Sequence, residues 1–199
     1  MPPRKSHSMR VSGGVSRGLP LAGAAVAGVR PTTERVRSAI FNILQPDQVE
    51  DCRVLDLYAG TGSLGIEALS RGATRADFVE RNRRQCRVIQ ENLDFTGYSD
   101  VGRVSCAEVL DWLNRSATHS GDNDLYDLVV LDPPYRMGEP TPTLERLAHS
   151  GLLHPDAIVV VGFSNRVTLP PDVHSLHEID RRSYGDNAVG FYVVRASAN

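Results

Sequence analysis

Apolar positions follow two alternating patterns along most of this chain. Short apolar runs predict buried strands at residues 53–58, 76–80, 103–106, 126–132 and 157–163. Amphipathic segments predict helices between them at residues 63–71, 82–95, 108–114 and 142–149. Strands that alternate with helices are typical of an α/β fold with a mostly parallel, doubly wound sheet.

The two ends of the chain follow a different pattern. Residues 9–21 contain two short strand-like stretches around glycines and predict a small β-hairpin. Residues 175–184 and 189–195 flank a Gly-Asp-Asn turn and predict an antiparallel hairpin at the edge of the sheet. We therefore divide the chain into an N-terminal extension, residues 1–30, and an α/β domain, residues 31–199.

A further helix is expected at the start of the α/β domain. Pro31, Thr32 and Thr33 supply its start signal, an apolar stripe follows, and Pro46 ends it. Arg35 and Arg37 lie off this apolar stripe.

Composition narrows the class of protein. The chain has 199 residues, 41% hydrophobic and 23% charged, which is typical of a soluble globular domain. Its three cysteines are widely spaced, so we expect neither a disulfide framework nor a metal site. No apolar run is long enough for a bilayer, and no apolar segment follows the charged N-terminus. We therefore expect a cytoplasmic protein without a membrane partner.

The net charge of −2 hides a strong asymmetry. Residues 1–37 carry a net charge of +6, and the remainder carries −8. Nearly all the positive charge is arginine, whose planar guanidinium suits phosphate groups. A basic segment on an acidic body predicts a localised contact with an anionic partner. The candidate residues are Arg4, Lys5, Arg10, Arg17, Arg30, Arg35 and Arg37.

A glycine-rich loop lies between the first predicted strand and its helix. Gly60, Gly62 and Gly65 form a G-x-G-x-x-G pattern, which permits a tight turn and close approach of a ligand to the backbone. Glu80 ends the next strand, 20 residues after Gly60, where a carboxylate can accept both hydroxyls of a ribose. The loop predicts an adenosine-type cofactor; the alternative is a tight turn with a surface glutamate.

Asp56 sharpens the choice of cofactor, because a carboxylate before the loop suits an ammonium group and not a pyrophosphate. The run D-L-Y-A-G-T-G resembles the first motif of class I S-adenosylmethionine-dependent methyltransferases, which have a Rossmann-like sheet. The resemblance implies that Asp56, Gly60 and Gly62 hold the methionine part and that Glu80 holds the ribose. It places Ala107 and Glu108 near the adenine. The full predicted cofactor set also includes Tyr58 and Asp132.

The tetrapeptide Asp132-Pro133-Pro134-Tyr135 ends the fourth predicted strand, at the same sheet edge as the glycine loop. The prolines fix the backbone, so the Asp132 carboxylate and the Pro133 carbonyl can accept both hydrogens of an amino group. Tyr135 can stack on the ring that carries this group. The two motifs together resemble methyltransferases that act on amino groups of adenine, guanine, cytosine or glutamine.

The N-terminal segment distinguishes among these targets. M-R-V-S-G-G, S-R-G-L and R-P-T-T-E-R-V-R resemble the RsmD family, bacterial methyltransferases of the guanine N2 amino group in 16S rRNA. The resemblance covers nearly the whole chain and implies that Arg30, Thr32, Thr33, Arg35 and Arg37 lie near the cofactor and the RNA. The family often has an extra basic pair where this chain reads Gly18-Leu19-Pro20, so fewer phosphate contacts are expected there.

The same resemblance implies the partners. It points to 16S rRNA within the small ribosomal subunit or an assembly intermediate, with ribosomal proteins as further contacts and the chain as a monomer. Other interpretations are an amino methyltransferase of another RNA, DNA adenine or protein glutamine, a nicotinamide oxidoreductase, and a non-catalytic RNA-binding module. Lys5 is the only lysine, which excludes the oxidoreductases that use a Tyr/Lys pair.

Overall fold

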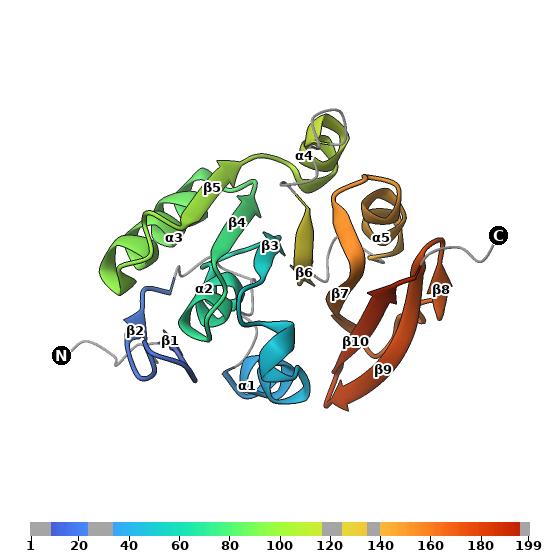
Figure 1. Cartoon of the computed structure of the whole chain (residues 1–199), viewed down its shortest axis with the longest axis horizontal. Coiled ribbons are helices and arrows are strands. Elements are labelled where there is room, and N and C mark those ends of the chain that lie inside the picture. Colours follow the sequence, from blue (N-terminus) through green and yellow to red (C-terminus); the bar gives the residue numbers. More distant parts are fainter. Residues whose placement is uncertain (1–8, 24–33, 117–124, 135–139, 196–199) are drawn as a thin grey trace.

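The structure is a computed structural model that describes residues 9–23, 34–116, 125–134 and 140–195. Its centre is an eight-stranded sheet in the order β5-β4-β3-β6-β7-β10-β9-β8 (Figure 1). The parallel strands are β3 Arg53–Leu57, β4 Arg75–Glu80, β5 Gly102–Cys106, β6 Tyr126–Leu131 and β7 Leu153–Ser164. The antiparallel strands are β8 Asp172–Val173, β9 Leu176–Tyr184 and β10 Asn187–Val194. This architecture confirms the predicted mostly parallel sheet with an antiparallel C-terminal hairpin.

The strand order places a switch point in the middle of the sheet. The chain runs outward from β3 through β4 to β5, then returns to pair β6 with the other side of β3. In such sheets ligands bind outside the carboxyl ends of the strands at this reversal. The carboxyl ends of β3, β4 and β6 are therefore where a site is expected.

Helices cover both faces of the sheet (Figure 1). They are α1 Glu34–Ile43, α2 Ser63–Ser70, α3 Arg83–Thr96, α4 Val109–Ser116 and α5 Thr141–Ala148. The first three pack with Val54, Phe78 and Val130 in one hydrophobic core. The last two pack with Leu55, Leu57 and Val129 in the other. Neighbouring residues of β3 enter opposite cores because side chains alternate along a strand.

The N-terminal hairpin is present but very short. β1 Met9–Arg10 pairs with β2 Pro20–Leu21 in antiparallel register. Val11 and Leu21 are each 2% exposed and belong to the same core as α1, α2 and α3. The hairpin is therefore packed into one face of the α/β domain.

Some elements differ from the sequence-based expectation. β7 begins at Leu153, four residues before the predicted start, because its pairing with β6 continues across an irregularity between Tyr126 and Leu128. Pro155 and the positive φ of 66° at Asp156 lie in this irregular stretch, and they conceal the strand start from the periodicity. The short strand β8 and the 3-10 helix η1 Pro46–Gln48 were not expected.

Within the four described segments, none of the helices combines the length and the apolar character that crossing a bilayer requires.

Candidate active site

The glycines of the loop before α2 serve two different purposes. Gly60 has a φ of 57°, and a Cβ added there would meet only the Tyr58 carbonyl oxygen, at 3.9 Å. A Cβ at Gly65 would instead lie 2.3 Å from the Phe78 ring, and one at Gly62 would lie 3.0 Å from Ile89. Gly62 and Gly65 thus permit close packing under the loop, whereas Gly60 leaves the backbone open to a ligand.

Glu80 fixes the glycine loop from the end of β4. Its Oε2 accepts the Gly60 N–H at 3.0 Å, and its Oε1 accepts the Asn82 N–H at 2.8 Å. An ionised carboxylate offers about four acceptor positions, so both oxygens can accept further hydrogen bonds. Asn82, which the sequence pattern did not single out, also caps α3 through its side-chain oxygen.

Asp56 lies beneath the loop and not on its surface. The residue is 1% exposed, and its Oδ2 accepts the Gly65 N–H at 2.9 Å, at the start of α2. Burial raises the pKa of Asp56 well above its usual range, and the nearby charges of Asp132 and Glu80 raise it further. The three carboxylates are therefore close enough to interact. In this structure the Asp56 carboxylate therefore contacts the start of α2 and does not line the outer surface of the loop.

Asp132 directly follows β6. Its N–H donates to the Leu57 carbonyl at 3.4 Å, so it lies beside the end of β3 at the switch point. A Cβ added at Gly162 would lie 2.5 Å from Asp132 Oδ1, which shows that the carboxylate occupies the space above this glycine of β7. Burial raises the pKa of Asp132 to about 6. Pro133 is buried and Pro134 is half-buried.

The other predicted cofactor residues surround the same edge. Tyr58 adopts a positive φ of 60°, uncommon for a side chain of its size, and its hydroxyl lies 2.9 Å from Thr143 Oγ1 on α5. Burial raises the pKa of Tyr58. Ala107 donates its N–H to the Glu80 carbonyl at 3.0 Å, and Glu108 forms an ion pair with Arg81 at 3.6 Å. Both residues thus lie next to the end of β4.

Comparison with known proteins assigns this chain to a family. The family model described as "Conserved hypothetical protein 95" matches residues 9–193. Ribosomal RNA small subunit methyltransferase D of Escherichia coli strain K12 is 35% identical over 174 residues, which cover 86% of this chain and 84% of the relative. The chain belongs to this RsmD family. The putative rRNA methyltransferase YlbH of Bacillus subtilis strain 168 is 32% identical over 190 residues, 94% of this chain and 100% of the relative.

A solved structure similar to this RsmD-family chain is the putative methyltransferase yhhF from Escherichia coli. It superposes with a TM-score of 0.83 at 29% sequence identity, covering 96% of this chain and 99% of that one. The agreement extends over both the α/β domain and the N-terminal hairpin, because it covers nearly all of each chain.

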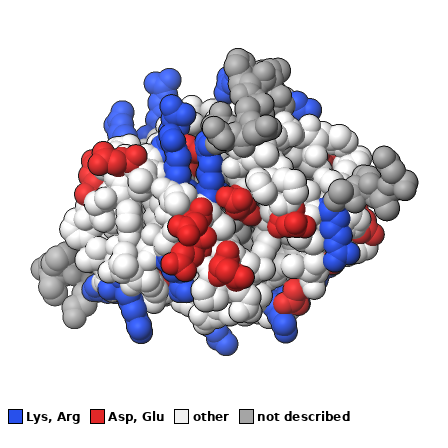
Figure 2. All heavy atoms as spheres, in the orientation of Figure 1, with Lys and Arg blue, Asp and Glu red and all other residues white. Residues whose placement is uncertain are grey.

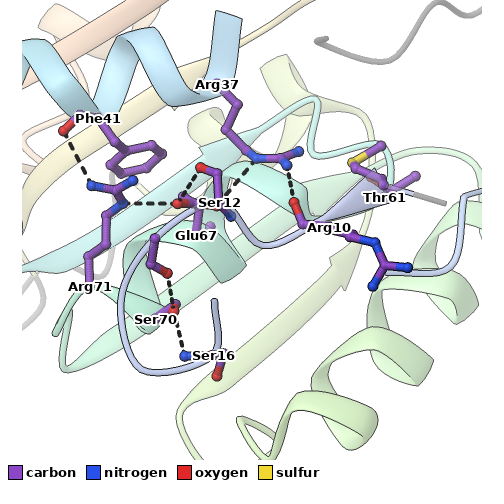
Figure 3. A network of polar contacts seen from close by, with 12 residues as sticks. Arg10, Ser12, Ser16, Arg37, Phe41, Thr61, Glu67, Ser70 and Arg71 are labelled. Carbon is purple, nitrogen blue, oxygen red and sulfur yellow. Dashed lines mark hydrogen bonds and ion pairs between the residues drawn. The ribbon is translucent and has the colours of Figure 1, made fainter. Parts of the chain in front are cut away.

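A buried polar network attaches the N-terminal hairpin of this RsmD-family chain to α2 (Figure 3). Glu67 of α2 is fully buried, and its carboxylate accepts both the backbone N–H and the hydroxyl of Ser12, each at 2.7 Å. The same carboxylate pairs with Arg71 at 2.9 Å and with Arg37 of α1 at 3.3 Å. Glu67 thereby joins the hairpin, α1 and α2.

Arg37, one of the predicted RNA contacts, is buried in the structure. Arg37 is 0% exposed, pairs with Glu67, and also donates to the Arg10 carbonyl oxygen. It lies off the apolar stripe because the surface it faces is the polar underside of the hairpin and not solvent. Arg37 therefore has no surface to offer to RNA in this structure, and we remove it from the predicted RNA contacts.

The remaining predicted RNA contacts divide into two groups. Arg10, Arg17 and Arg35 are exposed, and they remain candidates. The others lie outside the described residues: Arg4, Lys5, Arg30, Thr32, Thr33 and Tyr135.

A second link connects the hairpin to the glycine loop. The Asn92 amide on α3 donates to the Thr61 carbonyl at 2.9 Å and to the Ala22 carbonyl at 3.1 Å, and it accepts the Ala22 N–H at 2.7 Å. Asn92 is 2% exposed. The exit of the hairpin is thus held directly against the loop that contains Gly60 and Gly62.

Proposed function

We propose that this chain transfers a methyl group from S-adenosylmethionine to the exocyclic N2 amino group of a guanine in 16S rRNA of the small ribosomal subunit. The observation that carries the proposal is the position of Asp132. It follows β6 at the switch point, interacts electrostatically with Asp56, and is followed by two prolines. The relative named ribosomal RNA small subunit methyltransferase D supports the same reaction class.

The residues around the glycine loop fit this cofactor. S-adenosylmethionine supplies a methyl group that its sulfonium has already activated. The open backbone at Gly60 accommodates the methionine part, and the half-buried Glu80 carboxylate accepts the ribose hydroxyls. Ala107 and Glu108, which lie next to the end of β4, would contact the adenine. Asp56 contributes to the methionine site from beneath, since its carboxylate accepts the Gly65 N–H and fixes the glycine loop at the start of α2.

Asp132 and Pro133 prepare the amino group. An amine conjugated to a purine ring is a weak nucleophile, because its lone pair is delocalised into the ring. When Asp132 and the Pro133 carbonyl accept its two N–H groups, the nitrogen becomes pyramidal and its lone pair is available for attack. The fixed φ of the prolines holds both acceptors in place, so no reorganisation is needed at the moment of transfer. A pKa of about 6 leaves Asp132 mainly ionised above neutral pH, as this role requires.

The choice of rRNA rests on the N-terminal segment and the family. Arg10, Arg17 and Arg35 present exposed guanidinium groups on the hairpin and α1, and two relatives are named as rRNA methyltransferases. Arginine binds phosphate through two parallel hydrogen bonds, which suits an RNA backbone. We further propose that Tyr135 stacks on the guanine and that the chain acts as a monomer in the cytoplasm, with ribosomal proteins as additional contacts.

The direct test is transfer of a labelled methyl group from S-adenosylmethionine to three acceptors in parallel. These are small ribosomal subunits that lack the modification, naked 16S rRNA and double-stranded DNA. We expect labelled methyl groups in the subunits. A lower yield on naked 16S rRNA would show that the assembled particle is recognised. Label in DNA alone, or in none of the three while the cofactor is bound, contradicts the proposal.

A further inference from the structure

A second basic surface lies outside the N-terminal segment. Arg81, Arg83, Arg84 and Arg87 follow Glu80 within seven residues, and all four are exposed. They occupy the end of β4 and the first turns of α3. Figure 2 shows arginine side chains gathered at the upper left of the view, where Figure 1 draws α3 and β5. We call these four residues the α3 arginine patch.

The patch is unfavourable for the helix that carries it. The amino end of a helix has a partial positive charge, so cations there are destabilising and acids are favoured. The first turn of α3 nevertheless contains no acidic residue and starts with Arg83 and Arg84. Arg87 lies on the same helix face, four residues after Arg83. Residues that break a local rule without a structural gain indicate a functional site.

No acidic side chain in the described part of the chain neutralises most of this charge. Arg83, Arg84 and Arg87 form no ion pair with any described residue. Arg81 pairs with Glu108 at 3.6 Å, but its side chain remains 58% exposed. The guanidinium groups are therefore available to an anionic partner.

The position of the patch relates it to the candidate active site. It begins one residue after Glu80, and β4 lies two strands from β6, which corresponds to about 10 Å between their carboxyl ends. α3 also contacts the hairpin, since Tyr98, just after its end, lies 2.7 Å from Ser16 and Asn92 holds Ala22. The patch and the hairpin thus lie on the same face of the sheet. The patch is at the amino end of α3, and the hairpin contacts the helix near its carboxyl end.

We propose that the α3 arginine patch binds backbone phosphates of the substrate RNA beside the modified nucleotide. This inference rests on the proposed function, because it assigns a second contact surface to the same RNA. Exposed arginines bind phosphate through forked hydrogen bonds and release condensed counterions. The patch adds to the contacts of the hairpin and is consistent with the reduced basic charge after Gly18.

The test compares two double variants that remove equal charge. Arg84→Gln/Arg87→Gln alters the patch, whereas Arg75→Gln/Arg195→Gln removes two exposed arginines outside it, at the start of β4 and just after β10. Affinity for unmodified 16S rRNA and for small subunits assembled from it is measured between 50 and 300 mM salt, about the range in which phosphate contacts are lost. We expect the patch variant to lose roughly ten-fold in affinity for both at low salt, with a salt slope smaller by about 1.4. The control variant should match the unaltered chain.

Three outcomes contradict the proposal in distinguishable ways. Equal loss in both variants, or no loss in either, overturns the patch alone and leaves the proposed function intact. Loss on assembled subunits but not on naked rRNA shows that the patch meets a ribosomal protein, which overturns the phosphate assignment. Failure of the unaltered chain to bind any RNA overturns the proposed function and the patch together.

Thermal unfolding separates binding from a structural role. If the arginines only supported α3, their replacement would lower the unfolding temperature. Because they oppose the helix dipole, we expect Arg83→Gln/Arg84→Gln/Arg87→Gln to unfold at an equal or higher temperature while RNA affinity falls further. A lower unfolding temperature that accounts for the affinity loss contradicts the proposal.

Discussion

Two buried carboxylates, those of Glu67 and Asp56, lie on the same face of the sheet, and their surroundings differ. Glu67 faces the guanidinium groups of Arg37 and Arg71 and accepts two hydrogen bonds from Ser12. Asp56 accepts one backbone N–H and has the acidic neighbours Asp132 and Glu80. Burial alone raises the pKa of Asp132 to about 6.

This difference distinguishes a carboxylate that stabilises the fold from carboxylates that form a candidate functional site. A buried acid that faces cations and donors, such as Glu67, holds elements together, and removing it leaves those cations buried. Acids that are desolvated beside other acids store unfavourable energy, which is typical of functional sites. The two groups meet through α2, because Asp56 holds the start of this helix and Glu67 lies near its end.

The largest expected effect is the loss of methyl transfer in the variant Asp132→Asn. This substitution keeps the shape of the side chain but removes its charge. The amide accepts fewer N–H groups from the target amine, so turnover should fall roughly 10²- to 10⁴-fold. Cofactor binding, followed by calorimetry, should change far less than turnover, because the Gly60 loop and Glu80 supply most of the proposed cofactor contacts. Unchanged turnover would refute the role of Asp132.

Glu67→Ala should cost about 3–5 kcal/mol of unfolding free energy, because it leaves Arg37 buried opposite an apolar methyl group. Urea denaturation measures this value. Glu91→Ala on α3 is the matched control, since Glu91 is exposed, and it should stay within about 0.5 kcal/mol. Similar losses in both variants would show that Glu67 has no special structural role.

Gly162→Ala should displace the Asp132 carboxylate, since the added Cβ would lie 2.5 Å from its Oδ1. A misplacement of about 1 Å lowers turnover roughly 10²-fold. The control is Gly23→Ala, whose Cβ meets no atom within 4 Å. Steady-state kinetics on small subunits would report the change, and full activity of Gly162→Ala would show that the Asp132 carboxylate does not need the space above β7.

The pH dependence follows from the raised pKa of Asp132. Transfer requires the ionised carboxylate, so turnover should rise through pH 6 and be about ten-fold lower at pH 5 than at pH 8. Stability changes in the opposite direction. The Asp132 carboxyl binds its proton more tightly in the folded state than in the unfolded state. Its contribution to the free energy of unfolding is therefore fully present below about pH 4 and is lost as the pH rises through about 6.

At pH 8 the free energy of unfolding of Asp132→Asn, measured by urea denaturation, should therefore exceed that of the unaltered chain by about 1–3 kcal/mol. This difference should vanish at pH 4. A variant that is less stable at pH 8 would indicate that Asp132 supports the fold instead of being held at a cost.

Local patterns allowed much of the fold and site to be predicted. The parallel strands, the glycine loop and Asp132 each depend on neighbouring residues or on fixed spacings, and the sheet brings their ends together. Contacts between distant segments have no such local signal. Ser12 and Glu67 are separated by 55 residues, so the burial of Arg37 beneath the hairpin could not be read from its helix pattern. The start of β7 was missed because Pro155 interrupts the apolar run.

The identity of the atom that receives the methyl group tests the proposed function most directly. Small subunits lacking the modification are incubated with the chain and labelled S-adenosylmethionine, their 16S rRNA is digested, and the labelled nucleosides are separated and identified. We predict N2-methylguanosine as the labelled product, and at least about a hundred-fold slower formation of it with Asp132→Asn. Label on another base, or on a ring nitrogen of guanine, would contradict the proposed reaction.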